Sequence, residues 1–132
     1  MEKDKLRNWM HQLIKKEKHN LLNLNIIYCD DNFLRRINRE YLNHDFYTDI
    51  ITFDNSDKRE MINGDIYISI DRVTTNSITY GNTFRDELHR VMAHGVLHLV
   101  GYGDKNNMQR SEMKKKEDYW LEKRQFSTND SK

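Results

Sequence analysis

Residues 94–104 read His-Gly-Val-Leu-His-Leu-Val-Gly-Tyr-Gly-Asp, and this stretch sets the expectation for the fold of the whole chain. His94 and His98 are four residues apart, so on a helix they lie one turn apart on the same face. That spacing suits one metal ion bound by two imidazole nitrogens. Gly101 and Gly103 then offer the positive φ angles that end a helix and turn the chain back. The stretch therefore predicts a helix, a glycine turn and a returning segment.

Asp104 is the first strong ligand type after the glycine turn. Two histidines and one carboxylate form an established catalytic zinc set, and three protein ligands leave a fourth position open for water. We therefore predict that His94, His98 and Asp104 bind one zinc ion, with the carboxylate making the site tolerant of harder ions such as Mn²⁺. An alternative interpretation is that Asp104 caps the next helix by accepting a hydrogen bond from its first N–H groups.

Gly95 argues against one class of metalloenzyme. Proteases with the H-E-x-x-H motif place a glutamate beside the first histidine as general base. Gly95 occupies that position here, so protease chemistry is not expected. The nucleophile would instead come from a metal-activated hydroxyl whose pKa the ion lowers toward neutrality. The alternative is a pair of half-buried helix histidines with no metal, which the glycine turn and the acid after it disfavour.

The wider string from His94 through Tyr102 resembles H-G-x-L-H-L-x-G-Y-D-H. This is the signature of the YbeY family, bacterial zinc-dependent endoribonucleases that mature ribosomal RNA. Two further segments are similar to the family and occur in its order: Thr-Asp-Ile-Ile-Thr-Phe at 48–53 and Gly-Asp-Ile-Tyr-Ile-Ser at 64–69.

The chain departs from the family pattern at three positions. Gly103 and Asp104 stand where the family has aspartate and histidine, and Leu42 stands where the family commonly carries an arginine. A cation near the metal would stabilise the charge that develops on a phosphate. Leu42 cannot do this, so Arg39, one helical turn earlier, and His44 are the candidates to replace it.

The resemblance implies a metal-dependent, single-strand-specific endoribonuclease that acts in 16S rRNA 3′-end processing and ribosome quality control. Metal-activated water or an RNA 2′-hydroxyl would attack the phosphodiester. The implied partners are single-stranded ribosomal RNA and the small ribosomal subunit. A second hypothesis is a ribosome-assembly factor that binds this RNA and whose metal is mainly structural. The net charge of only +1 favours it, because nucleic-acid-binding domains are often clearly basic.

Length and composition limit the remaining possibilities. The 132 residues are expected to form one domain over 1–132 with a single core. No run approaches the roughly 20 apolar residues of a membrane span, and no signal peptide is recognised, so no membrane partner is expected. Cys29 is the only cysteine, which excludes a disulfide framework and favours the cytoplasm.

Hydrophobic spacing predicts an α+β fold with one mixed sheet of about four strands, the number that the resemblance implies, and helices packed on it. Helices are expected over 2–19, 32–42, 72–80, 83–101 and 107–124, and strands over 24–29, 49–54 and 65–70. Side chains expected to cap helices are Asp30 or Asp31, Asp71, and Thr83 with Asp86. Asn63-Gly64 is expected to form a turn. In the helix over 83–101, His94 and His98 should lie at the rim of the core, beside the apolar stripe.

Overall fold

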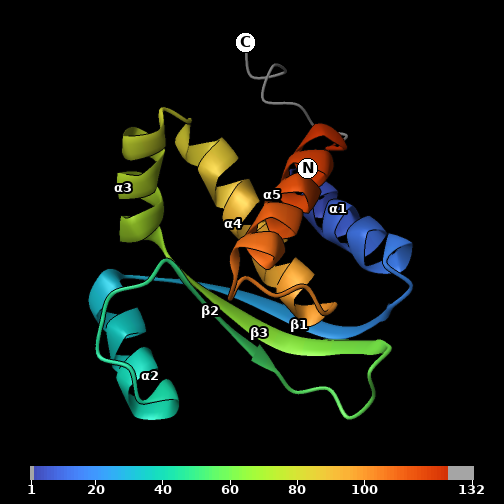
Figure 1. The fold of residues 1–132 in the computed structure, drawn as a ribbon, viewed down its shortest axis with the longest axis horizontal. Coiled ribbons are helices and arrows are strands. Elements are labelled where there is room, and N and C mark those ends of the chain that lie inside the picture. The colour runs from blue at the N-terminus through green and yellow to red at the C-terminus, as the bar shows by residue number, and fades with distance from the viewer. Residues whose placement is uncertain (1, 125–132) are drawn as a thin grey trace.

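A three-stranded sheet lies at the centre of the computed structural model, which describes residues 2–124 (Figure 1). β1 (Asn20–Cys29) runs parallel to β3 (Met61–Ser69), and β2 (Ile50–Asp54) pairs antiparallel with the other edge of β3. Successive side chains of a strand point to opposite faces. Both faces of this sheet are used, because helices pack on each of them.

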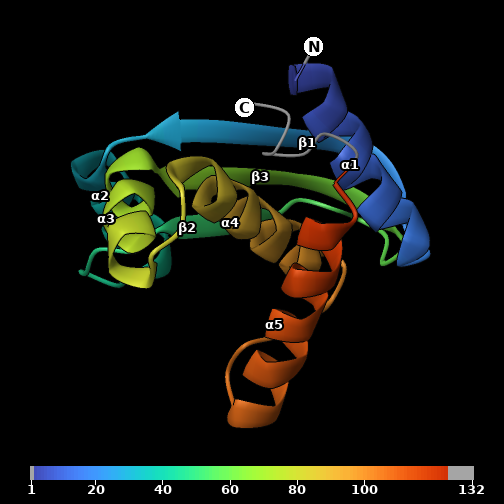
Figure 2. The ribbon, with the colours of Figure 1, turned by 90° about the horizontal axis from the view of Figure 1, so that it is seen from above.

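Four helices lie on one side of the sheet and one on the other (Figures 1 and 2). The first group contains α1 (Glu2–Lys16), α3 (Ile70–Tyr80), α4 (Phe84–Leu99) and α5 (Asn107–Glu122), and α2 (Asp31–Leu42) packs alone on the opposite face. The larger core fills the space between α1, α4 and the sheet, where Leu13, Ile66 and Val96 are all 0% exposed. A smaller cluster of Leu34, Ile37 and Ile51 holds α2 in place.

The predicted α+β class is confirmed, but the sheet within residues 2–124 has three strands rather than about four. The segment before β1 cannot supply another strand, because its buried residues Trp9, Met10 and Leu13 recur at helical spacing and form α1. All three strands recognised in the sequence are present. Within residues 2–124, none of the helices combines the length and the apolar character needed to cross a membrane.

Asn63-Gly64 is not a turn, contrary to expectation, because both residues lie within β3. A Cβ atom added at Gly64 would lie 2.7 Å from the carbonyl oxygen of Phe53 and 3.1 Å from the side chain of Leu99. The glycine is therefore required by close packing between the sheet and the end of α4, not by a left-handed conformation.

Two of the expected helix caps are confirmed. Asp30 Oδ1 accepts the N–H of Phe33 at 2.8 Å at the start of α2, and Thr83 Oγ1 accepts the N–H of Asp86 at 3.0 Å at the start of α4. Each bond satisfies one of the N–H groups that a helix leaves free in its first turn. The second cap fixes where the helix carrying the two histidines begins.

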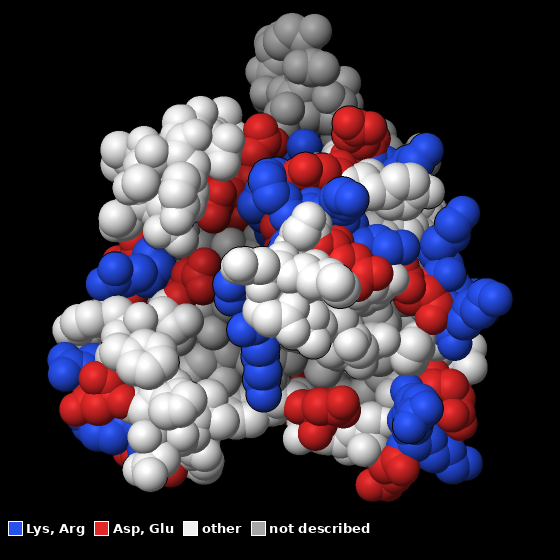
Figure 3. Space-filling model, in the orientation of Figure 1, with Lys and Arg blue, Asp and Glu red and all other residues white. Residues whose placement is uncertain are grey.

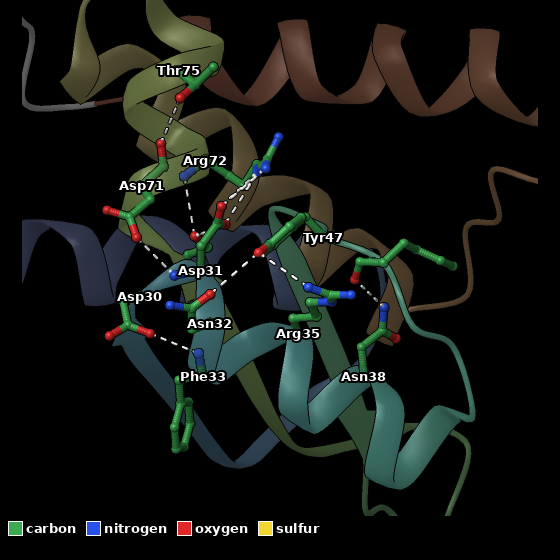
Figure 4. Close-up of polar contacts among 12 residues, drawn as sticks. Asp30, Asp31, Asn32, Phe33, Arg35, Asn38, Tyr47, Asp71, Arg72 and Thr75 are labelled. Atoms are coloured by element: carbon green, nitrogen blue, oxygen red, sulfur yellow. Dashed lines mark hydrogen bonds and ion pairs between the residues drawn. The ribbon is translucent and has the colours of Figure 1, made fainter.

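Asp71 does not cap α3, because Ser69 occupies the N-cap position and accepts the N–H of Arg72. Asp71 instead accepts the main-chain N–H of Asp31 at 2.9 Å, as Figure 4 shows. The Asp31 carboxylate in turn accepts Nε of Arg72 at 3.1 Å and the hydroxyl of Ser69 at 2.8 Å. These contacts join α2 to α3 around the end of the sheet, and Arg72 also lies 5.0 Å from the ring centroid of Tyr47.

Candidate metal centre

α4 presents His94 and His98 together, as their spacing predicts. Their rings pack edge to face with centroids 4.6 Å apart, and their side chains are 23% and 29% exposed. The neighbouring residues Val96, Leu97 and Leu99 are buried. The two imidazoles therefore sit at the rim of the core, where a ligand atom is partly shielded from water yet reachable from solvent.

Gly95 lies on the side of α4 that packs against the sheet. A Cβ atom there would lie 2.9 Å from Cδ1 of both Ile50 and Ile66. Only a residue without a side chain lets the helix approach the sheet this closely. A glutamate at this position would collide with these sheet residues, which gives a structural reason for the absence of a protease-type base.

Gly101 ends α4 with φ at 115°, and its N–H donates to the carbonyl of His98 at 3.0 Å. The expected positive φ at Gly103 is wrong, since the only glycines of residues 2–124 with positive φ are Gly81 and Gly101. At Gly103 a Cβ atom would lie 2.8 Å from Oε1 of Gln109, the far end of a flexible side chain that can move aside. Of the two glycines, Gly101 is therefore the one whose conformation the turn requires.

The turn brings Asp104 back to the two histidines. Its Oδ2 lies 3.3 Å from Nε2 of His98 and 3.4 Å from Nε2 of His94. One nitrogen or oxygen atom from each of the three residues falls within 4.8 Å of the others. Ligands placed about 2.0–2.1 Å from a tetrahedral zinc ion are about 3.3–3.4 Å apart, so the two measured nitrogen–oxygen separations fit such an ion. Asp104 does not cap α5, because Asn106 does so by accepting the N–H of Gln109 at 2.8 Å.

Glu117 of α5 fixes the ring of His94. Its Oε2 lies 2.7 Å from Nδ1 of His94, and its Oε1 accepts Nη1 of Arg90 at 2.9 Å. When Nδ1 donates to the carboxylate, Nε2 keeps the lone pair that a metal needs. Burial lowers the pKa of His94, but the hydrogen bond to Glu117 and its charge outweigh this, so the pKa is raised. Glu117 could not be predicted from the sequence, because no local pattern links it to a histidine 23 residues away.

Arg39 and His44 make no contact with His94, His98 or Asp104 among the described residues. Arg39 Nη1 lies 3.8 Å from Oδ1 of Asp45, and the ring of His44 stacks on Phe46 with centroids 5.2 Å apart. α2, which carries Arg39, packs on the face of the sheet opposite α4. Their role as the phosphate-facing cation stays a prediction.

A further histidine on α4, His89, is buried at 1% exposure and belongs to a different environment. Its Nδ1 lies 2.8 Å from Nη1 of Arg124, and its ring lies 5.8 Å from that of Trp9. Burial, reinforced by the charges of Arg124 and Arg85, lowers the pKa of His89 to about 4. This histidine therefore stays neutral in the fold and packs as part of the core.

A cavity adjoins the candidate metal centre between the end of α3, α4 and α5. His94 and Asp104 line one part of it, and Tyr80, Arg90 and Arg110 line others. The face drawn in Figure 3 mixes Lys and Arg with Asp and Glu, without a continuous basic area. The charge available to an anionic ligand is therefore local.

The chain is similar to known proteins along nearly its whole length. The family model described as Endoribonuclease YbeY matches residues 1–125. The chain belongs to the YbeY endoribonuclease family. A relative from Cytophaga hutchinsonii named Endoribonuclease YbeY is 50% identical over 125 residues, which cover 95% of this chain and 87% of the relative. Another from Amoebophilus asiaticus is 47% identical over 116 residues, covering 88% and 79%.

A solved structure also supports the fold. The solution structure of a Thermotoga maritima protein matches with a TM-score of 0.65 and 28% identity, covering 91% of this chain and 81% of the other. The family resemblance inferred from the motif segments is thus confirmed by sequence over nearly the whole chain and by structure.

Proposed function

We propose that this chain is a metal-dependent endoribonuclease of single-stranded RNA, with His94, His98 and Asp104 as the metal ligands. The observation that carries the proposal is the position of Asp104 Oδ2, 3.3 Å and 3.4 Å from the two histidine Nε2 atoms. Two neutral imidazoles and one carboxylate suit zinc and tolerate harder divalent ions. When bound, the ion supplies Lewis acidity to a phosphate oxygen and lowers the pKa of the attacking hydroxyl of water or of RNA.

The chain's own residues orient this site. Glu117 holds His94 by Nδ1, so the ring presents Nε2 toward Asp104. Arg90 donates to the other oxygen of Glu117 and fixes that carboxylate in turn. The three ligand side chains are between 23% and 41% exposed, which leaves room for an RNA strand to approach from one side.

The substrate class rests on the family, whose relatives bear the name endoribonuclease. We further propose that the RNA is ribosomal, that cleavage serves 16S rRNA 3′-end processing and ribosome quality control, and that the small ribosomal subunit is the partner, in the cytoplasm. The mixed charges of Figure 3 favour one competing function, an assembly factor whose metal is mainly structural. Catalysis and assembly are separated by removing the ligands without unfolding the protein.

The test compares purified protein with the His94→Ala/His98→Ala variant on an unstructured RNA, with metal content measured in both. The matched control is His11→Ala/His19→Ala, in which His11 lies on α1 and His19 lies between α1 and β1. We expect the parent and the control to bind metal and cleave, and the site variant to do neither. Equal cleavage by the site variant would identify a contaminating nuclease. A folded site variant that restores rRNA processing in a null strain would favour the assembly function instead.

A further inference from the structure

Arg110 is held beside the candidate metal centre by two hydrogen bonds. Its Nη1 donates to the main-chain carbonyl of Asp104 at 3.3 Å, and its Nη2 donates to Oδ1 of Asn107. The guanidinium is therefore tied to the same short segment that returns Asp104 to the histidines. It lines the cavity that His94 and Asp104 also line.

The positive charge of Arg110 is not neutralised by a carboxylate of residues 2–124. Both of its acceptors are neutral, and it forms no ion pair with a carboxylate of residues 2–124. The other cations of this cavity are paired, since Arg90 contacts Glu117 at 2.9 Å and Asp118 at 2.7 Å, and Lys114 lies 3.7 Å from Asp118. Among the described residues that line the cavity, Arg110 is therefore the cation that is available to an anionic ligand.

We propose that Arg110 contacts the phosphate of the RNA strand beside the metal, and that the cavity leading from Asp104 toward Tyr80 holds the adjoining nucleotide. The inference rests on the proposed endoribonuclease function and names a residue for it. Arginine binds phosphate through a planar fork of donors, and it stabilises charge developing on a transferring phosphoryl group. Arg110 therefore supplies the cation that Leu42 cannot provide.

Tyr80 indicates on which side of Arg110 the RNA strand continues. Its side chain is 66% exposed at the end of α3, and it lines the same cavity as Arg110. Proteins that bind single-stranded nucleic acid combine cations along the backbone with exposed aromatic rings on which bases stack. We place the phosphate at Arg110 and a neighbouring base on Tyr80.

The kinetic test uses Arg110→Gln and Arg110→Lys in the metal-loaded protein. Loss of one donor to the transition-state charge costs about 10²-fold in kcat, so Arg110→Gln should lose about that much. Arg110→Lys restores the charge without the fork and should recover part of the rate. Lys115→Gln, on the same helix and exposed, is the charge-matched control and should keep full activity. Arg39→Gln tests the competing cation, because a loss of rate there in place of Arg110→Gln would assign the role to Arg39.

A binding test separates this inference from the proposed function. Fluorescence anisotropy with single-stranded RNA is measured at several salt concentrations in the His94→Ala/His98→Ala background, where no cleavage is expected. The logarithm of the affinity falls with the logarithm of the salt concentration, and loss of one phosphate contact makes this fall less steep by about 0.7. Arg110→Gln should show this change, Tyr80→Ala should weaken binding at every salt concentration, and Lys115→Gln should change neither.

The outcomes are distinct. If Arg110→Gln reduces binding but the metal-loaded parent protein does not cleave RNA, the phosphate contact would be supported and the nuclease assignment overturned. Unchanged kcat and salt slope in Arg110→Gln, or a loss in Arg39→Gln instead, would overturn the role of Arg110. Loss of zinc from Arg110→Gln, with no rescue by Arg110→Lys, would show that the side chain only holds the Asp104 segment, and would also overturn it.

Discussion

Nδ1 of His94 and Oε2 of Glu117 lie 2.7 Å apart, although His94 belongs to α4 and Glu117 to α5, 23 residues later in the chain. Because Nδ1 faces the carboxylate, the remaining nitrogen of the ring faces Asp104 at 3.4 Å. Outer carboxylates of this kind fix the tautomer of a ligating histidine and raise its basicity. The packing of α5 on α4 is therefore part of the candidate metal centre.

Glu117→Gln should weaken metal binding by about 10- to 100-fold, because the amide keeps the shape of the carboxylate but not its charge. Affinity is measured by zinc competition against a chromophoric chelator. Glu112→Gln, an exposed position on α5, is the control and should bind as the parent does. Because Glu117 also accepts from Arg90, thermal unfolding without metal is recorded for both variants. A Glu117→Gln protein with parental zinc affinity would show that the contact only joins the two helices.

Substitutions should distinguish the role of Asp104 as a metal ligand from that of Asn106 as the N-cap of α5. Asp104→Ala should lose metal affinity strongly and abolish cleavage, while Asp104→His, which restores the residue of the family signature, should retain both. Asn106→Ala removes the N-cap of α5 and should cost about 1 kcal/mol of stability with metal affinity unchanged. The measurements are zinc competition and urea denaturation. The assignment fails if Asp104→Ala binds zinc like the parent.

The parts of the site that the sequence predicts are those that lie close together in the chain. His94, His98 and Asp104 fall within one helix turn and the glycine turn that follows, so local geometry alone brings them together. The helices and strands were likewise recognised from periodic apolar residues. Glu117 and Arg110 were not, because their places depend on how α5 packs against α4.

Glycine shows why local reasoning fails elsewhere. Gly64 was taken for a turn residue, yet it is required because the main-chain oxygen of Phe53 lies 2.7 Å from where its Cβ would be. Gly103 was expected to have a positive φ and does not have one. A glycine selected for space looks the same in a sequence as one selected for a positive φ. The strand count was set too high because it was carried over from the family rather than read from this chain's own pattern.

Gly95→Ala should destabilise the protein by about 1–3 kcal/mol, the usual cost of overpacking a core. In an open helix the same change would stabilise by about 1 kcal/mol through helix propensity. The sign reverses because the new Cβ atom would lie 2.9 Å from Ile50 and Ile66 of the sheet. Urea denaturation measures the difference, and Ser111→Ala on the exposed surface of α5 gives the response of an open helix position. An increase in the stability of Gly95→Ala would show that α4 does not sit this close to the sheet.

His89 makes the stability of the protein depend on pH. Its pKa of about 4 in the fold lies below the ordinary value of 6.5, because burial disfavours the charged ring. Between these two values the unfolded chain binds a proton that the folded chain does not, so the free energy of unfolding falls as the pH is lowered through this window. At about 1.4 kcal/mol per pKa unit, the loss approaches about 3 kcal/mol near pH 4.

His89→Gln keeps an acceptor for Arg124 but cannot titrate, so its stability should fall less steeply with acid than that of the parent. The carboxylates titrate in both proteins, and the difference between the two curves therefore isolates His89. Urea denaturation at several values between about pH 7 and about pH 4 measures it. His11→Gln changes an exposed histidine of α1 and should leave the acid slope as it is. Parallel curves for His89→Gln and the parent would mean that the folded chain protonates His89 as readily as the unfolded chain does, against its burial beside Trp9 and Arg124.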